Sequence, residues 1–247
     1  MGYLLDSCQF DRLSSEVINQ CQPYKCTKDT DIDSFFHLGN KDNFEDFSLE
    51  LMSNSHCCFT DEENPKMVCA FALASSALRT DVLPKSRRNR FNRDRKIPNT
   101  KRRSQYPAIL ITQLCIFDGF GNSVFGHDIG KEMMDLIKTM AIDPDNDNAA
   151  RYLVVDAINN PKVIDYYKRN GFELLFTSDE EEMACLRGYK NANPILRWLG
   201  DFFHVYKKDN SSECKTRLMF LFIPFACCPF IYTVISSDVN PDVTALK

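Results

Sequence analysis

One glycine-containing turn carries the residues whose types and spacing best suit a chemical role. The segment FGHDIGKEM, residues 125–133, joins an apolar run to an amphipathic one. A helix that begins near Gly130 leaves free backbone amides that can bind a phosphate or pyrophosphate, and glycine lets a ligand approach the backbone closely. The alternative is that the turn only reverses the chain. The turn alone therefore predicts an anion site without naming the ligand.

The elements that would position this turn lie on both sides of it. Residues 109–117 are apolar and β-branched and predict a buried strand, and residues 152–157, YLVVDA, predict a second. A helix is predicted between them from apolar residues at helical spacing, namely Met133, Met134, Ile137, Met140 and Ala141. A second helix is predicted to begin at Asn160 and Pro161 and to end at Gly171. Two parallel strands joined by a helix form a right-handed crossover unit.

The second helix makes this pattern specific. The segment NNPKVIDYYKRNGF, residues 159–172, resembles the Asn-x-x-x-x-x-x-Tyr-x-x-x-Gly-Phe pattern of the GNAT superfamily of acetyl-CoA-dependent N-acetyltransferases. The VVDA strand and the strand that ends at Ile116 fit the family in order and spacing. The resemblance, to the bacterial type, covers about residues 25–176 and is sharp over 106–173. It implies an α/β fold with a mixed central sheet, helices on both faces, and two neighbouring strands that splay apart to admit CoA.

The resemblance also implies roles for single residues. Tyr167, four residues before Gly171, occupies the family's general-acid position and would protonate the departing CoA thiolate, which suits a phenol with an ordinary pKa of about 10. Asn160 would hydrogen-bond the pantetheine arm. Acetyl-CoA is the implied co-substrate, and no metal is expected. The other cofactor contacts would come from the strand and the turn, namely Leu114, Cys115, Ile116, Phe125, Gly126, His127, Asp128, Ile129, Gly130 and Lys131.

The turn departs from the family pattern at two positions. Phe125 stands where the family commonly has Gln or Arg, and Asp128 stands at the first glycine position. A carboxylate beside a pyrophosphate is unfavourable unless it points away or is neutralised. These departures motivate a different hypothesis, a non-catalytic GNAT-fold interaction module with a basic nucleic-acid-binding loop.

No general base is evident on the central strand. Where family members often supply a carboxylate, this chain has Thr112 and Gln113. His127 is the imidazole near the turn, but it would lie on the phosphate side. We therefore expect a primary amine that loses its proton to water, or an amine of low pKa such as an aminoacyl α-amine.

A basic stretch is the second informative feature. Between Lys85 and Arg103 there are ten Lys or Arg residues and one acid, a charge of +9 in a chain with a formal net charge of −4. We expect a loop, residues 84–105, that is either simply solvated or a docking arm for a polyanion such as RNA or the CoA phosphates. The following run YPAILI resembles the strand entry of GNAT toxins. This resemblance gives an alternative function, acetylation of aminoacyl-tRNA through the loop 85–103.

The rest of the chain is expected to support one domain. Residues 1–223 would form the GNAT domain with an insertion at 178–214, and residues 224–247 would form an apolar, then polar tail. Residues 178–182 are expected to be an acidic surface run, and a helix is predicted over 195–206, with a possible homodimer contact. Apolar content is 44%, which suits a globular core. Phe35, Phe36, Phe44, Phe47 and Leu51 are expected in it.

The C-terminal region and the cysteines bear on the cellular location. Residues 218–235 form eighteen residues without a charge, the lower bound for a membrane helix, but Pro224 and Pro229 argue against one. We expect residues 217–223 to be the last sheet strand and membrane association to be unlikely. Eleven cysteines without an export signal suggest reduced thiols, so a cytoplasmic protein is expected.

Overall fold

The computed structural model describes residues 2–81, 83–92, 104–121, 126–143, 150–176, 178–182 and 216–222. The predicted contact at Phe125, the predicted helix over 195–206 and the tail 224–247 lie outside these residues. The basic stretch is described only as far as residue 92.

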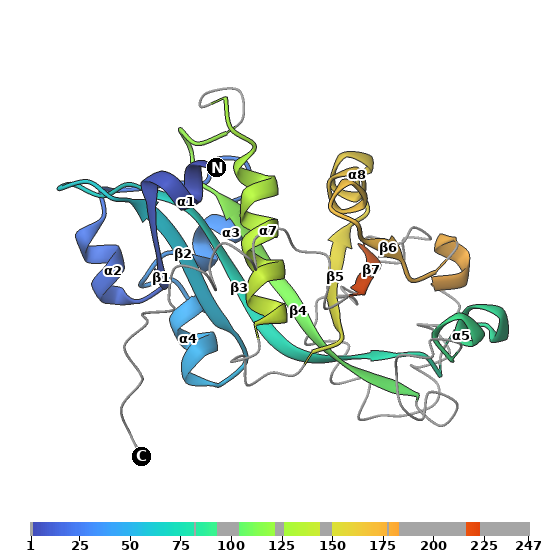
Figure 1. Ribbon diagram of the computed structural model, residues 1–247. Helices are drawn as coiled ribbons and strands as arrows, with labels where there is room; N and C mark the ends of the chain where they lie inside the picture. Colours follow the sequence, from blue (N-terminus) through green and yellow to red (C-terminus); the bar gives the residue numbers. More distant parts are fainter. Residues whose placement is uncertain are drawn as a thin grey trace, which may run out of the picture.

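A seven-stranded sheet forms the centre of the molecule, in the order β1-β2-β3-β4-β5-β7-β6 (Figure 1). β4 and β5 are parallel, and every other neighbouring pair is antiparallel. This mixed sheet confirms the predicted fold class. The strands are β1 Cys8–Arg12, β2 Asn54–Thr60, β3 Met67–Arg79, β4 Gln105–Ile116, β5 Tyr152–Ile158, β6 Glu173–Leu174 and β7 Thr216–Phe222.

Helices cover both faces of the sheet because successive strand residues point to opposite sides. Cys69 and Phe71 of β3 face a core shared with α7 and α8, whereas Ala70 and Ala72 face the core below α2, α3 and α4. Tyr106 and other aromatic residues form a third cluster farther along the second face. The helices are α1 Tyr3–Ser7, α2 Ser15–Gln20, α3 Thr30–Phe35, α4 Phe44–Leu49, α5 Lys85–Asn92, α7 Ile129–Ile142 and α8 Pro161–Arg169.

The predicted aromatic core is correct except at its last member. Phe35, Phe36 and Phe44 are buried, and Phe47 packs against them. Leu51, however, is 93% exposed. It follows the end of α4 with a φ of 57°, so the chain turns there and carries the side chain into solvent.

The basic stretch begins as a helix, so the prediction of a loop over 84–105 is wrong for residues 85–92. Phe91 anchors α5, since its ring is buried against Tyr106, Tyr152 and Phe220. Arg87 adds two hydrogen bonds to backbone carbonyls of residues 174 and 175. A single apolar anchor thus fixes an otherwise basic segment to the sheet.

The acidic run is not simply a surface feature. Arg217 of β7 is buried and forms ion pairs with Asp179 and Glu182. A carboxylate oxygen of Glu182 also accepts a hydrogen bond from the backbone N–H of Leu218, and burial raises the pKa of this carboxyl. The expectation of an acidic surface run over residues 178–182 is therefore wrong at Glu182, whose side chain is buried.

The uncharged run 218–235 begins in β7, which pairs with β5 over seven residue pairs, as predicted for the last strand. None of the helices in the described part of the chain has the length and apolarity that a membrane crossing requires.

Candidate active site

The two parallel strands of the sheet separate partway along their length. β4 pairs with β5 from Ala108–Tyr152 to Ile111–Val155, after which β4 continues to Ile116 and β5 to Ile158 without pairing. We call this divergence, residues 112–116 of β4 and 156–158 of β5, the wedge. Both segments remain paired on their outer sides, to β3 and β7. On the side that faces the wedge, residues 112–116 of β4 have no partner strand among the described residues.

A β-bulge lies where the wedge opens. The register between β3 and β4 shifts between Ala72 and Leu73, which leaves Thr112 without an opposite residue. The Thr112 hydroxyl donates a hydrogen bond of 3.1 Å to the carbonyl of Ala72. A bulge bends and twists its strand, which is the physical reason for β4 to leave β5 at this point. The sequence did not predict the bulge, although it singled out Thr112.

α7 follows the wedge end of β4, and the predicted anion turn, residues 126–131, runs from just before this helix into its first turn. Gly126 has a φ of 72°, a left-handed conformation that glycine adopts without strain. Asp128 is the N-cap, and its side chain accepts a hydrogen bond of 3.0 Å from the backbone N–H of Lys131. Its carboxylate therefore does not point away from the turn. The Lys131 ammonium forms an ion pair with Asp135, 3.1 Å away, rather than with Asp128.

Gly130 lies where α7 approaches its neighbours closely. A Cβ atom at this position would be 3.3 Å from the Tyr166 ring and 3.5 Å from the Ile116 side chain. The structure thus brings the end of β4, the first turn of α7 and the middle of α8 together, as the predicted site requires.

α8 begins at the wedge end of β5 with the predicted cap. The Asn160 side-chain oxygen accepts a hydrogen bond of 2.9 Å from the backbone N–H of Lys162. The side-chain NH₂ of Asn160 has no hydrogen-bond partner among the described residues. Gly171, with a φ of 88°, ends the helix as predicted. Asn160 is therefore oriented by one atom while its donor group remains available.

Two adjacent tyrosines of α8 have different surroundings. The Tyr166 hydroxyl donates a hydrogen bond of 2.8 Å to the carbonyl of Gly130, which joins α8 to α7. Tyr167 is 7% exposed and packs against Tyr166 and Phe172, and its hydroxyl has no hydrogen bond within the described residues. Burial raises the pKa of both phenols, so both are protonated at neutral pH.

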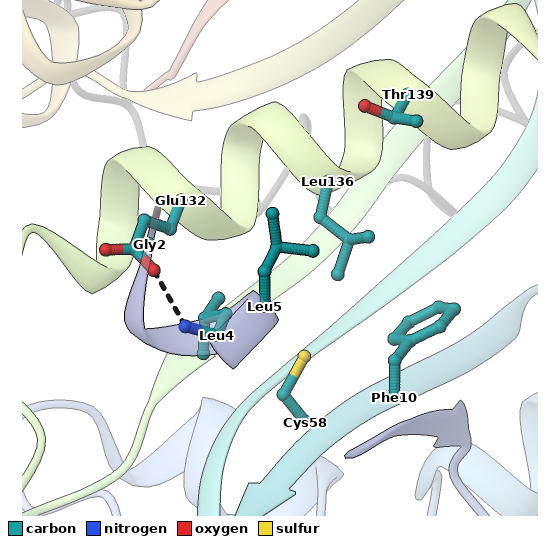
Figure 2. A pocket seen from close by; sticks show the side chains of 8 residues that line it. All are labelled: Gly2, Leu4, Leu5, Phe10, Cys58, Glu132, Leu136 and Thr139. Carbon is teal, nitrogen blue, oxygen red and sulfur yellow. Dashed lines mark hydrogen bonds between the residues drawn. The ribbon is translucent and has the colours of Figure 1, made fainter. Parts of the chain in front are cut away.

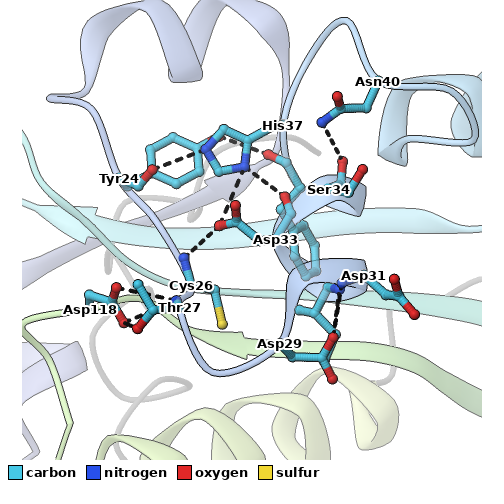
Figure 3. A network of polar contacts seen from close by, with 12 residues as sticks. Tyr24, Cys26, Thr27, Asp29, Asp31, Asp33, Ser34, His37, Asn40 and Asp118 are labelled. Atoms are coloured by element: carbon cyan, nitrogen blue, oxygen red, sulfur yellow. Dashed lines mark hydrogen bonds and ion pairs between the residues drawn. The ribbon is translucent and has the colours of Figure 1, made fainter.

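The other face of the sheet carries a polar network next to the end of β4 (Figure 3). Asp118 accepts hydrogen bonds from the backbone and hydroxyl of Thr27, and Asp33 accepts one of 2.5 Å from the backbone N–H of Cys26. His37 lies between the carbonyls of Tyr24 and Asp33. This network ties residues 24–37 to the strand that forms one side of the wedge.

Gln113 lies on this second face, because it pairs with Ala72. Its amide is half-buried and has no side-chain hydrogen bond in the part of the chain that the structure describes. Neither Thr112 nor Gln113 can act as a carboxylate base, so this part of β4 does not supply one.

Sequence reasoning missed two residues of this region, Tyr166 and Glu132. The contact of Tyr166 with Gly130 joins two residues that are 36 positions apart and lie on different helices, so no local sequence pattern reports it. Glu132 follows the expected contact residues directly, but the group that donates a hydrogen bond to it, the backbone N–H of Leu4, belongs to the N-terminal segment.

No protein-family model matches the sequence, and no curated protein matches it. Among solved structures, a tyrosine-to-phenylalanine mutant of KacT matches with a TM-score of 0.51 and 15% identity, over 68% of this chain and 87% of that chain. A protein described as a bacterial toxin matches with a TM-score of 0.50 and 13% identity, over 93% and 95%. AtaTR bound with AcCoA matches with a TM-score of 0.47 and 16% identity, over 70% and 90%. Together with the sheet order, the first two matches show that the chain has the GNAT acetyltransferase fold.

Proposed function

We propose that this chain is an N-acetyltransferase that moves the acetyl group of acetyl-CoA to a primary amine by direct attack. The observation that carries the proposal is the wedge, because residues 112–116 of β4 pair with no strand on the side of β5 among the described residues, and two helices begin at the open end of the wedge. Backbone groups of residues 114–116 would pair with the pantetheine arm, and the Asn160 amide would donate to it. The turn 126–131 would hold the pyrophosphate through its amides.

Tyr167 is the residue that we assign to the chemical step. The amine nitrogen attacks the acetyl carbonyl carbon, the carbon–sulfur bond breaks, and the thiolate takes the proton of the Tyr167 hydroxyl. The amine gives its proton to water, from which the phenolate is reprotonated. A backbone amide near Ile116 would stabilise the oxyanion. The absence of a competing hydrogen bond at Tyr167 among the described residues, in contrast to Tyr166, supports this assignment.

The first prediction concerns Tyr167→Phe. We expect this variant to lower kcat about 100-fold, because it removes a general acid, and to leave the Kd for acetyl-CoA within about twofold. Calorimetry with acetyl-CoA and release of CoA with a panel of amines measure the two quantities. Tyr106→Phe is the matched control, since Tyr106 is a buried tyrosine on the other face of the sheet.

The outcomes separate the hypotheses. Unchanged turnover in Tyr167→Phe would remove this residue from the mechanism. A wild-type chain that does not bind acetyl-CoA at all would leave the non-catalytic interaction module as the function. Measurable acetyl transfer would exclude that module.

Acetylation of aminoacyl-tRNA is the second candidate, and α5 is the observation that favours it. Lys85 is exposed and Arg88 half-exposed on this helix, while Arg87 is held by carbonyls. An aminoacyl α-amine also has a low pKa, which suits a site whose central strand has Thr112 and Gln113 where a carboxylate base is often found. Phe91 is buried, so it does not offer a stacking surface for a base.

The test of this candidate is the salt dependence of tRNA binding. We expect the double variant Lys85→Glu and Arg88→Glu to weaken binding and to flatten the slope of log K against log salt by about one unit per lost phosphate contact. Lys66→Glu, on the exposed β2–β3 turn, is the control. Binding that does not depend on salt would contradict a phosphate-docking helix.

A further inference from the structure

The N-terminal helix α1 lies against α7 beside the cofactor turn (Figure 1). A small apolar hollow of about 80 Å³ lies beside the two helices and is lined by Leu5, Phe10 and Leu136 (Figure 2). Leu4 of α1 is buried in the core that α7 shares, and further contacts lie at the N-terminal end of α1. Those contacts involve residues of the anion turn.

Glu132 makes the central contact. One oxygen of its carboxylate accepts a hydrogen bond of 2.8 Å from the backbone N–H of Leu4, in the first turn of α1. The other oxygen lies 3.8 Å from Nδ1 of His127, within the turn 126–131. A carboxylate near a helix N-terminus is stabilised by the free amides there, so Glu132 serves as the cap that α1 lacks from its own residues. One side chain thus joins the N-terminal helix to the turn.

Tyr3 makes the second contact. Its ring lies 5.4 Å from the ring of His127 and 6.4 Å from the ring of Phe120, measured between centroids. Phe120 precedes the turn and His127 lies within it, so Tyr3 contacts both ends of the segment that joins β4 to α7. Rings at these distances pack favourably.

Gly2 explains how the carboxylate can approach so closely. A Cβ atom at residue 2 would lie 2.7 Å from the carboxyl carbon and Oε2 of Glu132. The φ of Gly2 is −89°, which alanine adopts without strain. An alanine would therefore leave the backbone unstrained and displace only the carboxylate.

We propose that residues 2–7 brace the cofactor turn, with Glu132 as the positioning residue that transmits their position to His127 and residues 126–131. The proposal rests on the proposed function, since it assigns a part of acetyl-CoA affinity to a helix that lies outside the expected cofactor-binding residues. The brace lowers the entropy that the turn loses when the pyrophosphate binds.

Hydrogen exchange of the ligand-free chain tests the brace without any assumption about function. We expect Gly2→Ala to speed exchange at the amides of 126–131 about 3- to 10-fold, the effect of losing one hydrogen bond. Exchange in α8 should be unchanged within error, and the Tm should fall by no more than a few degrees, since one hydrogen bond is lost. Glu132→Gln, which keeps an acceptor for Leu4, should have a smaller effect than Glu132→Ala. Asp6→Asn is the control, because Asp6 is exposed on α1 and does not contact Glu132.

Calorimetry with acetyl-CoA then tests the consequence. We expect Gly2→Ala to raise the Kd by about the same factor as the exchange rate. Uniformly faster exchange across the chain, or unchanged exchange at 126–131, overturns the brace. An unchanged Kd with faster exchange overturns its link to the cofactor. A wild-type chain without acetyl-CoA affinity refutes the proposed function instead, while the exchange result still decides whether the brace exists.

Discussion

At the scale of single residues, the two adjacent tyrosines of α8 have different contacts, and we assign them different roles. The Tyr166 hydroxyl donates a hydrogen bond to the carbonyl of Gly130 and so fixes the rotation of α8 against α7. Tyr167, one residue further along the helix, is held by that rotation and by Phe172. A proton donor benefits from such a neighbour because it must be positioned without its hydroxyl being occupied. The sequence motif indicates Tyr167 through its spacing to Gly171, but it does not reveal the supporting contact.

Asp128 is the residue whose charge conflicts with the proposed ligand. We predict that Asp128→Asn binds acetyl-CoA about 3- to 10-fold more tightly than the wild type. Asparagine caps a helix as well as aspartate, so the Lys131 hydrogen bond and α7 are preserved while one negative charge beside the pyrophosphate is removed. Calorimetry at low and high salt measures the effect, which should shrink as salt rises.

Asp29→Asn is the matched control for this prediction. Asp29 caps α3 in the same way, by accepting hydrogen bonds from the backbone of Asp31 and Ile32, but it does not belong to the turn. Equal affinity changes in the two variants would indicate a general charge effect. Weaker binding in Asp128→Asn would mean that the carboxylate helps to hold the turn rather than opposing the ligand.

At the scale of elements, the sequence predicted β4, β5, α7 and α8 because their patterns are local. Met133, Met134 and Ile137 mark one face of α7, and Asn160 and Gly171 mark the ends of α8. It failed at α5, because this helix is basic and depends on a long-range contact of Phe91 with β4, β5 and β7. It also missed the bulge in β4, since a bulge depends on the register of the partner strand.

The strand β2 contains a group that makes stability depend on pH. The His56 ring stacks against Phe10 and against Phe71, whose rings also stack on each other. Burial, followed by the charge of Arg12, lowers the pKa of His56 to about 4, although Asp11 acts in the opposite direction. The unfolded chain, with a His pKa of about 6.5, then binds a proton that the folded chain does not. Stability from this residue is therefore complete above pH 6.5 and is lost as the pH falls toward 4.

We predict that the wild type loses about 2 kcal/mol of unfolding free energy between pH 7 and pH 5 through His56. His56→Phe keeps an aromatic ring in the stack but cannot titrate, so its loss over the same interval should be smaller by that amount. Urea unfolding at the two pH values measures both proteins. If the unfolding free energies of the wild type and His56→Phe fell equally between pH 7 and pH 5, His56 would not be the cause of the pH dependence.

At the scale of the whole molecule, the wedge divides the sheet into two parts. β1 to β4 form one part and β5, β7 and β6 the other, and four residue pairs join β4 to β5. The cores on both faces add contacts across this junction, chiefly through Ile109, Ile111, Leu153 and Val155 in the core below α7 and α8. A ligand that pairs with the open edges of both strands would extend the junction beyond Ile111.

We therefore predict that acetyl-CoA stabilises the entire chain against heat. At 100 times its Kd a ligand that binds only the folded state adds about 2.7 kcal/mol, which raises the Tm of a chain of this size by about 5–10 °C. ATP at the same concentration is the control, because it offers adenine and phosphates but no pantetheine to occupy the wedge. Equal Tm shifts with both ligands would show that the phosphate turn alone accounts for binding. The wedge between β4 and β5 would then not contribute to binding of the cofactor.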